Sequence, residues 1–322
     1  MRNTIINFAK QFAYKPVIEN EGGLKKRKRL IVIGMGGSHL AGDILAAIKP
    51  SLGIIVHKNY GIPEISEEDL DDSLIIFSSY SGNTEEVLDA YNMAKERNLA
   101  MAVISIGGKL LEWAKKDGVP FVQMPDTGIA PRFALGFSFL ALLKIAGEDE
   151  TLLDAEKLAA ELVPESWEEP GKRMAKNLAG KVPLIYASLK NQTLAYNWKI
   201  RLNETGCVPA FCNVLPELNH NELDGFDARE ATRGLSELFY FIFLRDPDDD
   251  PRIIKRMEAM KTILEEKNLP TEMLRLENGS ALYKIFASVI LADWATYYLA
   301  EDYGIAKDDL HLVEKFKKLI GQ

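Results

Sequence analysis

The chain has 322 residues and a formal net charge of −8, with the apolar and charged fractions of an ordinary globular protein. This length is enough for about two domains with sizeable cores, and the acidic balance argues against a nucleic-acid-binding protein. The two cysteines, Cys207 and Cys212, are too few for a disulfide framework or a cysteine-rich zinc site, so a reducing cytoplasm is the expected location.

The N-terminal segment lacks the apolar core of a signal peptide. Apolar residues recur at helical spacing between residues 5 and 13, which predicts a helix that docks on the fold. The most apolar stretch, residues 133–145, is shorter than the roughly 20 residues that span a bilayer. It therefore indicates a buried helix, and no membrane partner is expected.

Apolar runs alternate with helical patterns in the first half of the chain. The predicted strands cover residues 30–33, 53–57, 74–78, 101–106 and 119–123, and the predicted helices lie near residues 40–48, 83–97 and 131–146. Because the strands are continuously apolar rather than alternating, they are expected to form a parallel sheet with helices on both faces.

A second cycle follows an acidic stretch, residues 148–172, which contains Pro170 and Gly171 and is interpreted as an interdomain helix and linker. The predicted strands cover residues 182–187, 210–214, 235–244 and 272–276, and the predicted helices cover residues 193–203, 251–267, 281–303 and 310–320. The expected division is an N-terminal domain of residues 1–150 and a C-terminal domain of residues 151–322.

A glycine-rich turn, Gly34-Met35-Gly36-Gly37-Ser38, lies where the first strand meets a helix. Glycine there allows a sharp turn and lets a ligand approach the helix N-terminus. A dinucleotide site is the rival interpretation, but its third glycine is replaced by His39, and the acid expected after the second strand is missing. A tight turn without a ligand is the other alternative.

A hydroxyl-rich turn follows the third predicted strand. Ser79, Ser81 and Thr84 can each donate a hydrogen bond to a phosphate oxygen, and Gly82 permits an unusual backbone dihedral angle. Asn83 is the predicted N-cap of the next helix, whose N-terminus favours an anion. The alternative is a helix that is merely capped, and no motif for a nucleoside triphosphate is present.

These two turns together resemble the sugar isomerase (SIS) domain. Asn203-Glu204, followed by the sequence Pro-Glu-Leu-Asn-His-Asn-Glu at residues 216–222, resembles a narrower group, the bifunctional phosphoglucose/phosphomannose isomerase family. The resemblance extends from about residue 30 to residue 317. It implies an α/β fold of two doubly wound SIS-type subdomains, each a mainly parallel sheet flanked by helices. It also implies a dimer that works without cofactor or metal.

The resemblance assigns proton chemistry to two residues. Glu204 matches the base that moves a proton between neighbouring carbons through a cis-enediol or enediolate, and such a glutamate needs a pKa raised towards neutrality. His220 matches the residue that opens the cyclic sugar, and in the family it reaches the site from the partner subunit. A structural, hydrogen-bonded histidine is the alternative for His220. A metal site around it is the weaker interpretation, because zinc sites usually draw on several His or Cys ligands.

The resemblance assigns two further catalytic positions. Arg132 matches an arginine that stabilises the developing enediolate charge, and Lys317 matches a C-terminal lysine that assists ring opening, although Lys315 and Lys318 are alternatives. The phosphate-binding positions of the two turns are Gly36, Gly37, Ser38, Ser79, Ser81 and Thr84. The N-terminal subdomain would then hold the phosphate, and the C-terminal subdomain would carry the base and the ring-opening residue.

Three departures from the family pattern bear on sugar choice. They are Thr205-Gly206-Cys207 after the base, His39 beside the phosphate turn, and Lys307-Asp308-Asp309 before the last helix. The expected activity is an aldose–ketose isomerase acting on glucose 6-phosphate, with mannose 6-phosphate as a second substrate. The alternative is an SIS module that binds a sugar phosphate without catalysis.

Overall fold

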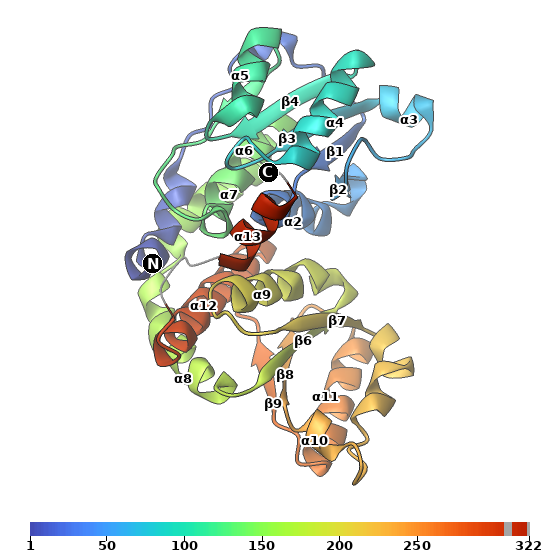
Figure 1. Ribbon diagram of the computed structural model, residues 1–322, viewed down its shortest axis with the longest axis vertical. Coiled ribbons are helices and arrows are strands. Elements are labelled where there is room, and N and C mark those ends of the chain that lie inside the picture. Colours follow the sequence, from blue (N-terminus) through green and yellow to red (C-terminus); the bar gives the residue numbers. More distant parts are fainter. Residues whose placement is uncertain (306–310, 321–322) are drawn as a thin grey trace. The chain divides into compact units, whose positions relative to one another are not determined.

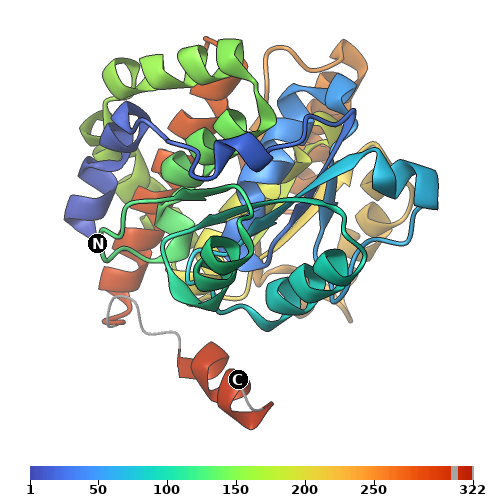
Figure 2. The same cartoon turned by 90° about the horizontal axis from the view of Figure 1, so that it is seen from above.

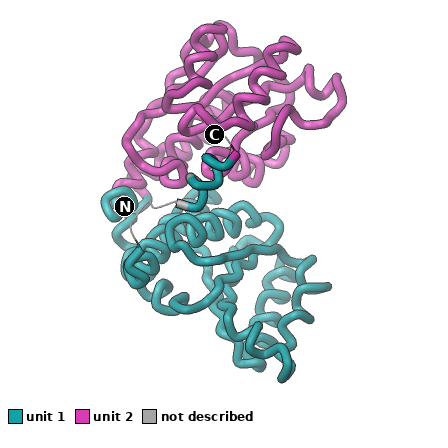
Figure 3. The backbone as a smooth tube through the Cα atoms, viewed as in Figure 1, with its two compact units in different colours: residues 1–6, 162–319 teal, residues 7–161, 320–322 magenta. Residues whose placement is uncertain are grey.

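The computed structural model describes residues 1–305 and 311–320. The chain divides into two compact units, drawn in different colours in Figure 3. One unit contains Asn7–Glu161, and the other contains Met1–Ile6 together with Leu162–Leu319. They are called the N-terminal unit and the C-terminal unit below. Each unit has its own sheet, so each holds its own core.

The sheet of the N-terminal unit has the strand order β2-β1-β3-β4-β5, and every neighbouring pair is parallel. Its strands are β1 (Arg29–Ile33), β2 (Ile55–His57), β3 (Ser73–Ser78), β4 (Ala100–Ser105) and β5 (Phe121–Gln123). The chain runs from β1 outward to β2 and then returns to β3 on the other side of β1. The direction of winding therefore reverses between β1 and β3.

Helices cover both faces of this sheet (Figures 1 and 2). On one side lie α2 (Leu40–Ile48) and α6 (Leu135–Ala146), and on the other lie α4 (Glu85–Glu96) and α5 (Gly108–Asp117). The remaining elements are η1 (Phe8–Ala13), η2 (Glu21–Gly23), η3 (Gly36–His39), η4 (Pro50–Leu52), α3 (Glu67–Asp71), η5 (Pro131–Phe133) and α7 (Asp149–Glu161). The apolar stretch at residues 133–145 lies mostly in α6, which is buried as predicted.

The sheet of the C-terminal unit has the strand order β7-β6-β8-β9 and is also parallel throughout. Its strands are β6 (Val182–Ser188), β7 (Phe211–Leu215), β8 (Phe239–Arg245) and β9 (Thr271–Arg275). Winding reverses between β6 and β8. The two units thus repeat one topology, and the predicted fold class is confirmed.

The helices of this unit are α1 (Arg2–Ile6), α8 (Glu168–Leu178), α9 (Gln192–Glu204), α10 (Arg233–Ser236), α11 (Pro251–Glu266), α12 (Ala281–Asp302) and α13 (His311–Leu319). The single-turn elements are η6 (Pro164–Trp167), η7 (Leu189–Asn191), η8 (Glu217–His220) and η9 (Glu222–Phe226). Helix α12 is buried along most of its length, and α8 and α9 pack against it. Met257, Met260 and Leu264 of α11 pack against β6 and β8.

The sequence predictions differ from the structure at several elements. The strand predicted from residue 235 begins at Phe239, because the preceding residues form α10. The linker predicted up to residue 172 is wrong at its end, since Pro170 and Gly171 lie in α8. Helix α5 was not predicted. The single helix predicted between residues 5 and 13 is two pieces, α1 and η1.

Tertiary packing explains why Gly171 does not end its helix. A Cβ atom at this position would lie 2.3 Å from the Cβ atom of Trp294 on α12. The glycine therefore permits the close approach of α8 and α12, and Pro170 occupies the first turn of α8, where a missing N–H group is tolerated. Helix-breaking residues in a sequence can thus serve helix packing.

Candidate functional site

The two turns predicted to bind phosphate meet at the carboxyl edge of the N-terminal sheet. The glycine-rich turn follows β1 and the hydroxyl-rich turn follows β3, where winding reverses. Ser78 Oγ donates to the carbonyl oxygen of Ser38 at 2.8 Å, and Ser38 Oγ accepts from the backbone N–H of Tyr80 at 3.0 Å. A Cβ atom on Gly34 would lie 2.9 Å from the carbonyl oxygen of Ser78. Such a reversal point is where open parallel sheets usually bind ligands.

The hydroxyl-rich turn is held by its own side chains. Ser79 Oγ and Thr84 Oγ1 are 2.8 Å apart, and Ser79 Oγ accepts from the backbone N–H of Gly82 at 3.1 Å. Ser79 is buried, whereas Ser81 is exposed. The N-cap prediction for Asn83 is wrong, because helix α4 begins at Glu85 and its N-cap is Thr84.

Asn83 instead joins this turn to the start of α5. Its Oδ1 atom accepts from the backbone N–H of Lys109 at 3.1 Å. Gly82 has a φ of 69°, and a Cβ atom there would lie 1.8 Å from the carbonyl oxygen of Gly107. Only glycine fits this close approach. Gly82, which was predicted to adopt an unusual dihedral angle, therefore also permits the contact between its own turn and the loop that contains Gly107.

The backbone of Arg132 packs against the glycine-rich turn. A Cβ atom on Gly37 would lie 3.0 Å from the backbone nitrogen of Arg132, so η3 and η5 are in contact. Arg132 is 1% exposed, and its guanidinium lies 4.7 Å from the ring centroid of Phe133. The structure thus brings Arg132 and both predicted phosphate turns to one edge of one sheet.

His39 is a buried residue beside these turns, and sequence reasoning gave it no partner. Its Nδ1 atom lies 2.7 Å from Oδ2 of Asp43, which also accepts from Lys58 Nζ at 2.9 Å. Burial by itself raises the pKa of Asp43, but the hydrogen bonds from His39 and Lys58 outweigh it, and the net shift is downward. Asp43 is therefore an ionised link between the start of α2 and the end of β2.

Glu204 is the last residue of α9 and is half-buried. One turn earlier, Arg201 Nε donates to Oδ1 of Asp293 on α12 at 2.6 Å, and both side chains are fully buried. The Arg201 carbonyl accepts from the backbone N–H groups of Thr205 and Gly206 at 2.8 and 3.1 Å. A buried ion pair therefore fixes the helix end that carries Glu204. Sequence reasoning missed Arg201, although a charged residue amid the apolar positions of α9 is a signal for a buried partner.

His220 lies on an exposed turn, η8, after the carboxyl end of β7. Helix α9 runs back from the carboxyl end of β6 to the amino end of β7, so Glu204 lies at the opposite edge of this sheet. The side chain of Asn203 marks that edge, since its Nδ2 atom donates to the carbonyl of Val208 at 3.0 Å just before β7. The five residues of β7 put roughly 16 Å between the two edges. Glu204 and His220 of one chain are therefore not brought together.

Lys317 lies in α13, and it is exposed, as are Lys315 and Lys318. The structure therefore does not distinguish among the three candidate lysines. The departure at residues 307–309 lies outside the described residues. Of the departures after the base, Thr205 and Gly206 are buried and Cys207 is exposed with a φ of 50°.

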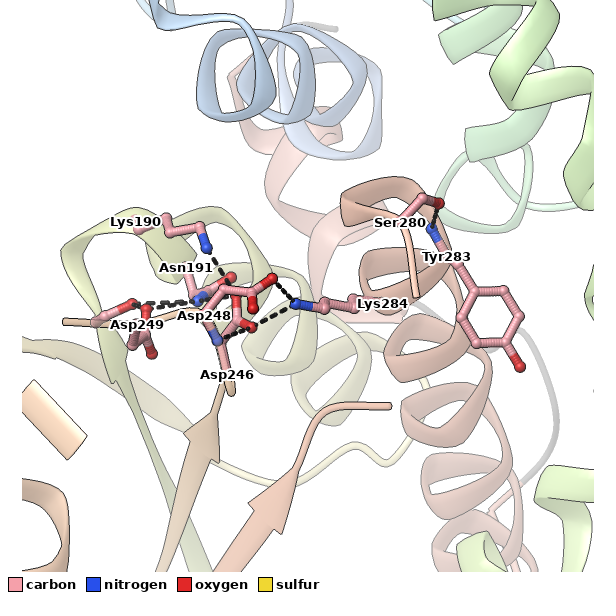
Figure 4. Close-up of polar contacts among 9 residues, drawn as sticks. Lys190, Asn191, Asp246, Asp248, Asp249, Ser280, Tyr283 and Lys284 are labelled. Atoms are coloured by element: carbon pink, nitrogen blue, oxygen red, sulfur yellow. Dashed lines mark hydrogen bonds and ion pairs between the residues drawn. The ribbon is translucent and has the colours of Figure 1, made fainter. Parts of the chain in front are cut away.

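The carboxyl edge of the C-terminal sheet carries a network of charges where its winding reverses (Figure 4). Asp246, directly after β8, accepts from Lys284 Nζ of α12 at 2.8 Å and from Lys190 Nζ at 3.0 Å. Asp249 accepts from Oγ of Ser188, the last residue of β6, at 2.6 Å. The point where winding reverses in the N-terminal sheet carries hydroxyl groups and glycines. The corresponding point of the C-terminal sheet is instead occupied by carboxylates of the chain itself.

Within residues 1–305 and 311–320, every helix is too short or too polar to span a bilayer. In the same part of the chain, no group of three or more His, Cys, Asp or Glu side chains is arranged to hold a metal ion. Cys207 and Cys212 are free thiols. What the sequence predicts about cofactor, metal and compartment stays a prediction.

Comparison with known proteins agrees with this architecture. The SIS domain model matches residues 23–112, and the model described as the bacterial phospho-glucose isomerase C-terminal SIS domain matches residues 167–320. A solved structure of a hypothetical protein from Thermus thermophilus superposes with a TM-score of 0.70 at 16% identity, covering 99% of this chain and 91% of that chain. The fold is thus that of a protein with two SIS domains.

Two curated relatives identify a narrower family among proteins with two SIS domains. The bifunctional phosphoglucose/phosphomannose isomerase of Aquifex aeolicus (strain VF5) is 31% identical over 318 residues, which are 97% of this chain and 95% of the relative. The protein of the same name from Caldicellulosiruptor bescii is 34% identical over 292 residues, covering 85% of this chain and 84% of the relative. The chain belongs to the bifunctional phosphoglucose/phosphomannose isomerase family.

Proposed function

We propose that this protein interconverts glucose 6-phosphate, and also mannose 6-phosphate, with fructose 6-phosphate through a cis-enediolate. The observation that carries the proposal is the match to relatives of that name over nearly the full chain. Loop placement supports it, because both predicted phosphate turns and Arg132 gather at the carboxyl edge of one sheet. The free thiols also lead us to infer a reducing compartment, the cytoplasm.

In the proposed reaction Glu204 is the base. Its carboxylate removes the proton from C2 of the open-chain aldose, a C1–C2 double bond forms, and negative charge develops on the carbonyl oxygen O1. The guanidinium of Arg132 stabilises that charge. The ketose forms when the carbon proton returns to C1 and the hydroxyl proton passes from O2 to O1, so that O2 becomes the carbonyl oxygen and O1 a hydroxyl; the reverse sequence gives the aldose. The burial of the Arg201–Asp293 pair suits this role, because a base has to be held at a fixed position.

The phosphate of the substrate is assigned to the N-terminal unit. Backbone N–H groups of the glycine-rich turn and the hydroxyls of the other turn are suitable donors to phosphate oxygens. The proposed donors are Gly36, Gly37, Ser38, Ser79, Ser81 and Thr84. The internal hydrogen bonds of Ser79 and Thr84 hold the turn in shape before a ligand binds.

Ring opening is assigned to His220 of a partner subunit, with Lys317 assisting. The imidazole would carry a proton between the ring oxygen and the anomeric hydroxyl. Because Glu204 and His220 lie at opposite edges of the C-terminal sheet within one chain, one site needs two chains to hold both residues. The proposal therefore includes a homodimer with His220 contributed across the interface.

A coupled assay tests the proposed function. The EDTA-treated protein is incubated with fructose 6-phosphate, and glucose 6-phosphate and mannose 6-phosphate are quantified separately. Formation of both products is expected. Glucose 6-phosphate alone would restrict the activity to one sugar. Neither product, with thermal stabilisation by fructose 6-phosphate, would support the alternative of a non-catalytic sugar-phosphate-binding module.

Mixing two inactive variants tests the shared site. Glu204→Gln and His220→Ala are each expected to be nearly inactive as homodimers. In a mixed dimer one site regains both native residues, so random exchange at equal concentrations should restore about one quarter of the native activity. The two proteins are unfolded and refolded together, and the activity is compared with that of each variant refolded alone. Activity no greater than the sum of the two would place both residues in one chain.

A further inference from the structure

The carboxylate of Glu222 bridges two neighbouring strands of the C-terminal sheet. Tyr186 on β6 and Asn213 on β7 are register partners in a parallel pair, so their side chains lie on the same face. Tyr186 Oη donates to Oε1 of Glu222, and Asn213 Nδ2 donates to Oε2 at 2.5 Å. Each carboxylate oxygen therefore accepts a hydrogen bond from a different strand.

Both donors are themselves fixed. Tyr186 is fully buried, and its ring packs against two aromatic rings of β8. Burial, together with the hydrogen bond to Glu222, raises the pKa of the Tyr186 hydroxyl, so it stays a donor at working pH. The Oδ1 atom of Asn213 accepts from the backbone N–H of Val214 at 2.8 Å, which turns its amide nitrogen towards Glu222.

Glu222 lies two residues beyond His220 and is the first residue of η9, the turn that follows the one carrying this histidine. Leu218, two residues before His220, is fully buried in the core of the unit. Between these two anchors His220 is exposed, and Asn221 has a φ of −143° and a ψ of −55°, which interrupts the helical turns on either side. The turn has no continuous helix to hold it, so its anchored side chains set the position of the imidazole.

We propose that Glu222 is a positioning residue for His220, fixing the turn that presents the imidazole. This inference rests on the proposed function, since His220 acts only where a cyclic hexose 6-phosphate has to be opened. Glu222 does not touch the substrate in this role. It acts through the backbone that joins it to His220.

Glu222→Gln is the isosteric test. The amide oxygen of glutamine can accept from only one side of this bridge. If it faces Tyr186, its NH₂ group meets the NH₂ group of Asn213; if it faces Asn213, its NH₂ group meets the Tyr186 hydroxyl, whose own proton then has to point away. In either orientation a hydrogen bond to a charged acceptor is lost. The turn is expected to shift, and a misplacement of about 1 Å lowers the turnover of fructose 6-phosphate by roughly 10- to 100-fold. Tyr186→Phe removes one hydrogen bond and should give a smaller loss of the same kind.

An open-chain substrate separates positioning from general damage. 5-Deoxyfructose 6-phosphate lacks the hydroxyl that closes the furanose ring, so it needs no ring opening. Glu222→Gln is expected to convert it at close to the native rate. In a double-mutant cycle on fructose 6-phosphate, adding Glu222→Gln to His220→Ala should cost little further activity, because both changes remove the same step.

The matched control is Glu217→Gln, on the same turn. Glu217 is exposed, and Oε1 accepts from Asn221 Nδ2 at 3.0 Å, so native turnover of both substrates is expected. Three outcomes would overturn the role of Glu222 while leaving the proposed function in place. They are equal losses of Glu222→Gln on fructose 6-phosphate and on the open-chain substrate, additive losses in the double-mutant cycle, and a Glu222→Gln variant as active as the native protein. A native protein inactive on both substrates would overturn the proposed function together with this inference.

Discussion

Glu204→Gln is expected to lower kcat for fructose 6-phosphate by about 10²- to 10⁴-fold, the usual contribution of a general base. Glutamine keeps the size of the side chain at the end of α9, and the buried pair of Arg201 with Asp293 keeps the helix end in place. The turns predicted to bind phosphate lie in the other unit, so binding of fructose 6-phosphate should change little. The expected result is a loss in kcat with a nearly native dissociation constant, measured by steady-state kinetics and by ligand-induced thermal stabilisation.

Solvent exchange provides the second measurement on this variant. A native isomerase in deuterated water should incorporate deuterium at C1 or C2 of the sugar, and Glu204→Gln should lose this exchange along with turnover. Glu266→Gln is the matched control, because Glu266 is also the last residue of a helix, α11, and is exposed. It should behave as the native protein does. If Glu204→Gln kept more than about a tenth of the native kcat, the base would have to be another residue.

Lys284→Met is expected to destabilise the C-terminal unit by about 3–5 kcal/mol, the usual cost of removing one partner from a buried ion pair. The side chains of Lys284 and Asp246 are 5% and 4% exposed, and their nearest charged atoms are 2.8 Å apart. Methionine fills the volume of the lysine stem but leaves the Asp246 carboxylate without its buried cation. Urea unfolding followed by tryptophan fluorescence measures the change, because Trp198 and Trp294 are both buried in this unit.

Lys190→Met is the control for this prediction, since Lys190 pairs with the same carboxylate but its side chain is 49% exposed. Its loss should cost about 1 kcal/mol or less, as for other solvent-exposed pairs. If the two lysine variants lost equal stability, burial would not be the cause. A nearly native stability of Lys284→Met would contradict the assignment directly.

The loss of stability in Lys284→Met is also expected to depend on pH in a definite direction. Burial alone raises the pKa of Asp246, but the hydrogen bond from Lys284 and the other donors outweigh it and hold that pKa below its ordinary value. A carboxyl group with a depressed pKa in the folded state adds stability above its unfolded pKa of about 3.9 and loses it as the pH falls. The deficit of Lys284→Met should therefore be largest near neutral pH and shrink below about pH 4.

Interpretation of the sequence was most successful where a single segment carries the signal. Apart from the start of β8, the buried strands of both sheets were predicted close to their observed bounds, because apolar runs bounded by turns depend only on neighbouring residues. The glycine-rich and hydroxyl-rich turns were each predicted to follow a strand, and the parallel pairing of β1 with β3 in the structure places both at one sheet edge. Errors arose where packing overrode local propensity, as at Gly171, which allows α8 to approach Trp294.

The side-chain contacts that fix the candidate site and its surroundings could not be predicted from the sequence. The hydrogen bond of Arg201 with Asp293 joins residues 92 positions apart, that of Lys284 with Asp246 joins residues 38 positions apart, and that of Tyr186 with Glu222 joins residues 36 positions apart. No short window of the sequence contains both partners. Their burial and geometry arise only when strands and helices pack.

By itself, the sequence determined the class of fold, the candidate phosphate turns and the candidate catalytic residues, because hydrophobic periodicity and short motifs are local properties of the chain. Only the tertiary structure decided that Glu204 and His220 lie at opposite edges of the C-terminal sheet. The reason is the path of α9, which returns the chain to the amino end of β7 before His220 is reached at the other end. The distance between two residues close in sequence is set by the strand that runs between them.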